Sequence, residues 1–247
     1  MKYLGVDGCP DGWLAVEYSG ERFRSADQYG DIEGLWEDHD DAELILIDVP
    51  IGLREEDNTP RPCDAEARER LGSPRSSSVF PTPVRGVLEA ESYKDAREKQ
   101  EYLTDGSLGA QTWGISDKIH ELDEFMRTDQ SEKEGTVRES HPEVCYWSLN
   151  DGQPTEYSKT GAPVAAFWER NEILETVDKE IYGVIREAGT GLESEATNDD
   201  LLDAFVLAIT ASELTGDTKT LPQNWPANDQ GDPEDLPMEM VYAEFIR

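Results

Sequence analysis

The stretch MKYLGVDGCPDGWLAVEY, residues 1–18, predicts two strands joined by a glycine-rich turn. An apolar run forms the first strand over residues 2–7, and apolar and aromatic residues resume over 12–18. Asp7 therefore stands at the end of a strand. Such a carboxylate can shape an Asx turn and nothing more, or it can be the first ligand of a metal site. Asp11, in the same turn, is interpreted as turn chemistry alone.

Two further strands are predicted to end in an acid. The run ELILIDVPIGL, residues 43–53, is apolar on both faces, which is typical of a strand buried in the centre of a sheet, and it ends at Asp48. A short strand over 136–140 ends near Glu139. We expect His141, which follows, either to cap the next helix or to act as a ligand or acid–base group.

The most apolar helix is predicted over residues 198–214, NDDLLDAFVLAITASEL. Asp200 and Asp203 are three residues apart and so share one face of it. Asp200 can simply complement the dipole at the helix N-terminus. Asp203 lies among apolar residues, and a buried carboxylate is costly unless it is paired or metal-bound. No lysine or arginine lies within a turn of it, so we expect a distant partner or a metal ion.

The composition predicts a folded, strongly acidic protein. The 247 residues include 55 acidic and 22 basic ones, giving a formal net charge of −33, and the acids are spread along the whole chain. With 9% aromatic residues and recurring apolar runs, the chain does not fit a disordered class. We interpret it as a halophilic protein with a solvated acidic surface, because molar salt screens self-repulsion.

The cysteines and the apolar runs indicate a cytoplasmic location. Three widely separated cysteines without a CxxC pair fit a reducing compartment and no structural zinc. The chain shows no basic-plus-apolar signal at its start and no apolar run near the ~20 residues that span a bilayer. We therefore expect no membrane partner, and the oligomeric state is not predicted.

One stretch departs from the acidic background. Five arginines and only three acids lie between Arg61 and Arg85. These arginines can form ion pairs along a helix, or they can contact an anionic substrate. On the second hypothesis the candidate substrate-binding residues are Arg61, Arg68, Arg85 and Lys118.

The order of elements predicts the fold class. Strands come first and helices then alternate with single strands, which indicates an α/β domain with a mixed β-sheet flanked by helices. We predict a single domain over residues 1–247 with an insertion at about 54–135, made of helices and a Pro/Ser-rich loop over 73–86. Residues 128–135 are expected to be a polar linker. Other expected elements are helices over 62–72, 91–103, 111–127, 161–177 and 179–189, and an edge strand over 240–246.

Several motifs together resemble a known family. GVDGCPDGW, IDVPIGL, RPCDAEAR with SSSVFPTPVR, QTWGISDKIHELD, ESHPEV and NDDLLDAFVLA are similar to the predicted ribonuclease-H-like nucleases called domain of unknown function 429, from residue 3 to about 214. The resemblance implies a ribonuclease H-like fold with Asp7 as the first-strand aspartate. It also implies Asp48 or Glu139 as the middle acid, and Asp200 with Asp203 as a pair on the C-terminal helix.

Clustered carboxylates favour Mg²⁺ or Mn²⁺, since hard divalent cations take oxygen ligands and a pair of such ions can activate water at phosphorus. The expected metal ligands are Asp7, Asp48, Glu139 and Asp203. We therefore predict a metal-dependent nuclease or phosphodiesterase acting on nucleic acid or a small phosphorylated substrate. Two alternatives stay open: an actin-like phosphotransferase, although no duplicate half is visible, and a non-catalytic binding or regulatory module.

Overall fold

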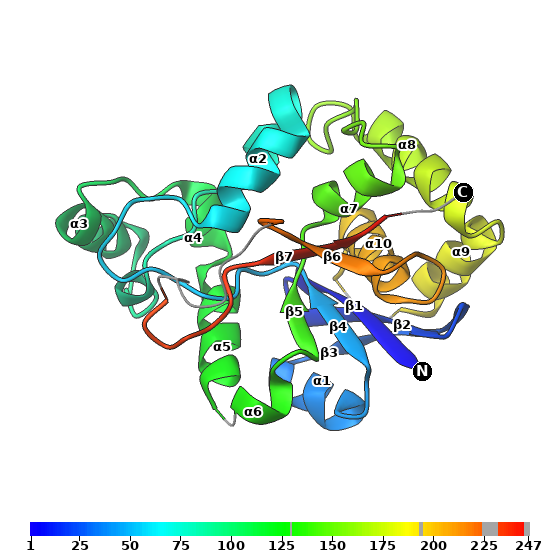
Figure 1. The fold of residues 1–247 in the computed structure, drawn as a ribbon, viewed down its shortest axis with the longest axis horizontal. Coiled ribbons are helices and arrows are strands. Elements are labelled where there is room, and N and C mark those ends of the chain that lie inside the picture. The colour runs from blue at the N-terminus through cyan, green and yellow to red at the C-terminus, as the bar shows by residue number, and fades with distance from the viewer. Residues whose placement is uncertain (129, 193–194, 224–231, 245–247) are drawn as a thin grey trace.

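The computed structural model describes residues 1–128, 130–192, 195–223 and 232–244. A five-stranded mixed sheet with the order β3-β2-β1-β4-β5 forms the centre of the molecule (Figure 1). β1 to β3 are antiparallel, whereas β4 and β5 run parallel to β1. The strands are β1 (Lys2–Cys9), β2 (Gly12–Ser19), β3 (Arg22–Tyr29), β4 (Leu44–Ile47) and β5 (Val137–Glu139). The α/β class with a helix-flanked mixed sheet is thereby confirmed.

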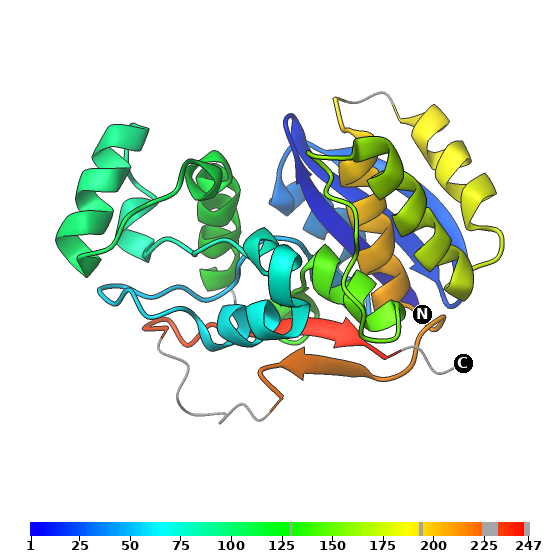
Figure 2. The same cartoon turned by 90° about the horizontal axis from the view of Figure 1, so that it is seen from above.

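Helices α7 to α10 cover one face of this sheet. Their apolar side chains form one core with Tyr3, Leu14 and Leu46 of the strands. α10 lies against β1 (Figure 2, orange on blue), and a Cβ added at Gly5 would come within 2.1 Å of the carbonyl oxygen of Ala204. The helix backbone reaches the strand only because residue 5 has no side chain. These helices are α7 (Pro142–Leu149), α8 (Pro163–Val177), α9 (Ile181–Gly191) and α10 (Asn198–Ala211).

Helices α1 (Ile32–His39) and α5 (Ser116–Arg127) cover the opposite face. Ile119 and Leu122 of α5 pack with Val6 and Ile45 of the strands. The C-terminal part of the predicted insertion therefore belongs to the core of the sheet. Residues 130–133, expected to be a linker, form the short helix α6 (Gln130–Lys133) instead.

The remainder of the 54–135 segment lies beside the sheet. α3 (Tyr93–Thr104) and α4 (Ala110–Gly114) lie to one side of it (Figure 1). Val84, Val87, Ala96 and Leu108 form a small core of their own there. The predicted end of the helix at Gly72 is confirmed: within α2 (Pro62–Arg75) the backbone leaves the helical region at Gly72, where φ is 57°, and a second short helical segment follows.

A second, two-stranded sheet adjoins the end of β5. β6 (Thr218–Leu221) pairs with β7 (Met240–Ala243), and Ser140 forms a parallel bridge to Val241. The predicted strand at 240–246 is confirmed as far as Ala243, and residues 245 and 246 lie outside the described residues. Among the helices of the described chain, none combines the length and the apolar character that crossing a membrane requires.

Candidate functional site

Asp7 and Asp48 lie side by side at the ends of two neighbouring parallel strands. Val6 pairs with Ile47, and the amide of Asp48 donates to the carbonyl oxygen of Val6 at 3.0 Å. Because side chains alternate along a strand, Asp7 leaves the sheet on the same face as Gly5, the face that α10 covers. Asp48 shares that face.

α10 brings the third acid to the same place. Asp203 stands next to Ala204, which contacts β1 at Gly5. Asp7 and Asp203 are 8% and 7% exposed, and both line one cavity with Asp48. Glu139 also lines this cavity, so four of the five acids that the sequence predicts border it, and three of them, Asp7, Asp48 and Asp203, lie on the face that α10 covers.

Glu139 lies one residue out of register with Asp48. In the parallel pair β4–β5, Glu139 stands beside Ile47, so the residue that would stand beside Asp48 is Ser140. The Glu139 side chain therefore points to the face that α5 covers. There it accepts two hydrogen bonds from Arg61, at 2.6 and 2.7 Å, and one from the amide of Ile51 at 2.6 Å. Of the two candidates for the middle acid, the register favours Asp48.

Asp200 caps its own helix. Its Oδ2 accepts the amide of Thr197 at 2.8 Å, and Thr197 Oγ1 accepts the amide of Asp200 at 3.3 Å, which is a capping box. Its charge still contributes to raising the pKa of Asp7. Asp200 therefore has a structural role at the margin of the cluster.

Two residues of the cluster were not predicted. Lys159, in the segment between α7 and α8, forms an ion pair with Oδ2 of Asp203. Glu143, in the first turn of α7, is paired with the buried Arg170 and accepts a hydrogen bond from Thr155 at 2.7 Å. Glu143 stands in the HPE motif, which already drew attention to His141. Lys159 lies in a polar loop 44 residues before Asp203, and no sequence pattern around it indicates a contact with Asp203.

The cluster holds more negative charge than its neighbours neutralise. Burial, followed by the charges of Asp48 and Asp203, raises the pKa of Asp7 well above its ordinary value. Burial also raises the pKa of Asp48, and it raises the pKa of Asp203 to about 6 against the opposing effect of Lys159. A cation close to these carboxylates would reverse the shifts.

Several carboxylate oxygens have no hydrogen-bond donor. In the described part of the chain, no donor reaches the carboxylates of Asp7 and Asp48, and the buried Oδ1 of Asp203 has no partner. Burying a carboxylate without a partner costs free energy unless a cation binds to it. Oxygen ligands of this kind suit magnesium or manganese, so the residues present fit a divalent ion.

These acids line a cavity of about 820 Å³ whose other lining residues include several cations. Lys118 lies 4.5 Å above the ring of Trp13 and 3.3 Å from Glu121. Arg75 has no carboxylate partner among the described residues, and its Nε lacks an acceptor. The cavity thus combines a cluster of acids with basic groups elsewhere in its lining.

His141 lines the same cavity but has no free ring nitrogen. Its Nδ1 accepts the amide of Glu143 at 3.2 Å, and its Nε2 donates to the carbonyl oxygen of Ser78 at 3.3 Å. Of the roles expected for His141, capping of α7 is confirmed.

The chain also matches a known protein family. The profile of a family described as a protein of unknown function, DUF429, matches residues 5–227. The chain belongs to the DUF429 family. No curated protein and no solved structure matches it. The part of the chain that matches DUF429 contains every acid of the cluster, from Asp7 to Asp203.

Two of the predicted substrate-binding arginines are paired with acids in this DUF429 chain. Arg61 is 3% exposed and pairs with Asp64 and Glu139. Arg85 pairs with Asp123 and Asp232. For both residues the ion-pair interpretation is therefore the one that the structure supports, because their guanidinium groups already hold carboxylates. Lys118 lines the large cavity, and Arg68 lines a smaller neighbouring one.

A second group of potential ligands lies around Arg61. Ligand atoms of Cys63, Asp64 and Glu139 come within 4.8 Å of one another, the one such group found among the described residues. Arg61 already donates to both carboxylates, and burial raises the pKa of the Cys63 thiol well above its ordinary value. A metal ion there would have to displace a buried guanidinium. The group is therefore an internal ion-pair network.

Proposed function

We propose that this DUF429 protein is a divalent-metal-dependent hydrolase of phosphodiester bonds with a ribonuclease H-like fold. The observation that carries the proposal is the set of three carboxylates, Asp7, Asp48 and Asp203, which line one large cavity and include a buried oxygen without a partner, Oδ1 of Asp203. The mixed sheet, with parallel strands β4 and β5 added to an antiparallel β1 to β3, supports the fold assignment.

The charges favour one metal ion instead of the expected pair. Asp7, Asp48, Glu143 and Asp203 carry four negative charges, and Lys159 and Arg170 carry two positive ones. Two negative charges remain, which is the charge that one Mg²⁺ or Mn²⁺ neutralises. The ammonium group of Lys159 would then serve where a two-metal site has its second ion.

Asp7, Asp48 and Asp203 would hold this ion. Oxygens of the three acids do not all lie within 4.8 Å of one another, so the three would not all bind one ion directly. One or two carboxylates would bind Mg²⁺, and the remaining acid would act through a water held by the ion. When bound, the metal would activate a water molecule and stabilise the leaving oxygen on phosphorus.

The rest of the cavity supports a short anionic substrate. Lys118 and Arg75 line the cavity and can hold a phosphate group, Arg75 through two parallel hydrogen bonds. A long duplex needs many such contacts, and they weaken steeply with salt. A chain with net charge −33 and so few free cations in this cavity favours a single-stranded segment or a small phosphodiester.

The test is cleavage in molar KCl with Mn²⁺ or Mg²⁺. Short single-stranded DNA, short RNA and bis(p-nitrophenyl) phosphate would be compared with wild type, Asp7→Asn and Asp203→Asn. We expect both variants to lose about 100-fold or more, because removing even an outer-shell partner of a metal site costs about 10–100-fold. The control is Asp11→Asn, which removes an exposed carboxylate from the turn after Asp7. Equal cleavage by all four proteins, or full activity in a chelator, would refute the proposal.

A further inference from the structure

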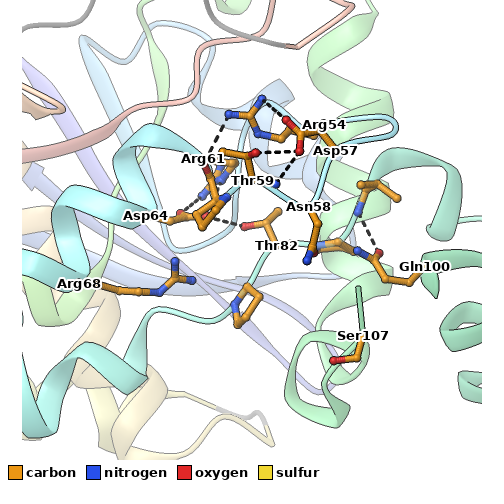
Figure 3. A pocket seen from close by; sticks show the side chains of 14 residues that line it. Arg54, Asp57, Asn58, Thr59, Arg61, Asp64, Arg68, Thr82, Gln100 and Ser107 are labelled. Atoms are coloured by element: carbon orange, nitrogen blue, oxygen red, sulfur yellow. Dashed lines mark hydrogen bonds and ion pairs between the residues drawn. The ribbon is translucent and has the colours of Figure 1, made fainter. Parts of the chain in front are cut away.

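A second cavity of about 300 Å³ adjoins the acidic one. It is formed by the segment 54–61, the start of α2, the segment 81–84 and parts of the 100–107 region. Figure 3 shows its side chains, with Arg54 and Arg61 near its upper part and Arg68 reaching it from α2. Arg61, Asp64, Pro81 and Thr82 line both cavities, so the two share a wall.

The carboxylates of this cavity already have partners. Asp64 accepts hydrogen bonds from Arg61 at 2.7 and 3.1 Å and from the hydroxyl of Thr82 at 3.0 Å. Asp57 accepts both the amide and the hydroxyl of Thr59, at 2.8 and 2.7 Å. Both oxygens of Asp64 therefore have donors, whereas Oδ2 of Asp57 has only the ion pair with Arg54 at 3.8 Å.

Two arginines in the lining, Arg54 and Arg68, each have one buried guanidinium nitrogen without a hydrogen-bond acceptor. Arg68 donates through Nε to the carbonyl oxygen of Val79 at 3.0 Å, but its buried Nη2 has no acceptor. In the chain as described, no carboxylate lies within ion-pair distance of Arg68, although the sequence holds 55 acids. The buried Nε of Arg54 also lacks an acceptor, while its Nη1 forms an ion pair with Asp57 at 3.8 Å and its Nη2 donates to the carbonyl oxygen of Pro60 at 3.4 Å.

The unpaired groups are all donors. Of the buried side-chain polar atoms without a partner in this lining, as far as the chain is described, both belong to arginines. Unpaired guanidinium donors fit a ligand that accepts hydrogen bonds, and guanidinium groups match the geometry of phosphate oxygens.

We propose that this cavity is a phosphate-binding subsite held by Arg68 and Arg54. Its assignment stands on its own geometry. Its link to the substrate rests on the proposed function: a phosphodiester lying over the shared wall would place a second phosphate here while the acids act on its neighbour. The preferred substrates would then carry at least two phosphate groups.

The direct test is calorimetric titration with inorganic phosphate, in a chelator and at constant ionic strength, using the full chain. Arg68→Gln should weaken binding about tenfold or more, since charge-assisted hydrogen bonds to phosphate are roughly twice as strong as neutral ones. Arg54→Gln, in a separate segment, should also weaken it and covers the case that Arg68→Gln does not fold. Arg70→Gln is the matched control on the same helix, because Arg70 pairs with Glu66.

Three results would overturn the subsite: no phosphate binding by wild type, unchanged affinity in folded Arg68→Gln or Arg54→Gln, or a loss caused by Arg75→Gln alone, which would place the anion in the large cavity. Asp7→Asn separates the two proposals, because it should abolish cleavage and leave phosphate binding intact. If Asp7→Asn keeps its activity while Arg68→Gln loses phosphate, the proposed function fails and the subsite stands.

Discussion

On the proposed function, Lys159 determines how many metal ions the site takes. Sequence reasoning identified the need of Asp203 for a partner, because a carboxylate inside an apolar helix requires one. It could not identify the partner, since an ion pair across 44 residues leaves no trace in local spacing. The lysine lowers the pKa of Asp7, Asp48, Glu143 and Asp203, so its charge acts on the whole cluster.

We expect wild type to bind one Mn²⁺ per chain and Lys159→Gln to bind a second. Removing the ammonium leaves three uncompensated negative charges, more than one divalent ion neutralises. Metal content after dialysis against Mn²⁺, together with calorimetric titration, gives the stoichiometry without reference to activity. Lys118→Gln, which removes a lysine elsewhere in the cavity, should leave it at one. Two ions in wild type would contradict the charge argument.

Asp7 should lower the stability of the metal-free protein at neutral pH. A carboxyl group whose pKa is higher in the folded state stabilises folding while protonated, and this contribution is lost as the pH rises through the folded-state pKa. In a chelator at pH 8, Asp7→Asn should therefore raise Tm by about 2–4 °C, or about 1 kcal/mol. The gain should shrink as the pH falls and vanish below the ordinary pKa of an aspartate, 3.8, where Asp7 is protonated in both states.

The control for this measurement is Asp11→Asn. Hydrogen bonding lowers the pKa of Asp11, an exposed residue, so its replacement should bring no such gain at pH 8. Added Mn²⁺ should reverse the order of wild type and Asp7→Asn, because a ligand of the folded state stabilises it. A lower Tm for Asp7→Asn in the chelator would contradict the prediction.

At the scale of elements, the limit of sequence reasoning is strand register. Apolar runs located β1, β4 and β5 and placed an acid near the end of each. Hydrophobic periodicity does not say which residue of one strand stands beside which residue of the next, and a shift of one residue changes the face. Glu139 therefore leaves the sheet on the opposite face from Asp7 and Asp48, although it borders the same cavity, and Glu143 of the following helix stands near Asp48.

The contact of α10 with β1 provides a test of how the site is held. Gly5→Ala would push a methyl group into the backbone of α10 at Ala204 and Ala208. We expect a loss of about 2–3 kcal/mol in the free energy of unfolding, as for other overpacked cores. Divalent-metal affinity should fall as well, because Asp203 would move away from Asp7.

Gly8→Ala is the matched control on the same strand. A Cβ there would meet only the flexible side chain of Lys118, at 3.5 Å. Urea denaturation of both variants gives the free energies, and titration with Mn²⁺ gives the affinities. Equal stability of the two variants would show that α10 can retreat from β1 without cost.

The whole molecule carries a net charge of −33, and this charge should make its stability depend on salt. Raising KCl from 0.1 M to 1 M shortens the Debye length from about 10 Å to about 3 Å and so weakens self-repulsion. We expect Tm to rise steadily over this range in the presence of a chelator. A matched series in sucrose separates this effect from general exclusion of cosolute. A flat dependence on KCl would contradict the halophilic interpretation.

The close approach of α10 to β1 at Gly5 limits which parts of this fold can change without disturbing the acids. The acids are carried by β1, the end of β4 and α10, whose backbones interlock, so moving one of them would disturb the hydrophobic core. The Arg68 pocket, by contrast, is built from residues 54–107, most of which lie outside that core. On the proposed function, exchanging this outer segment would change the phosphate subsite and one wall of the acidic cavity while leaving Asp7, Asp48 and Asp203 on their elements.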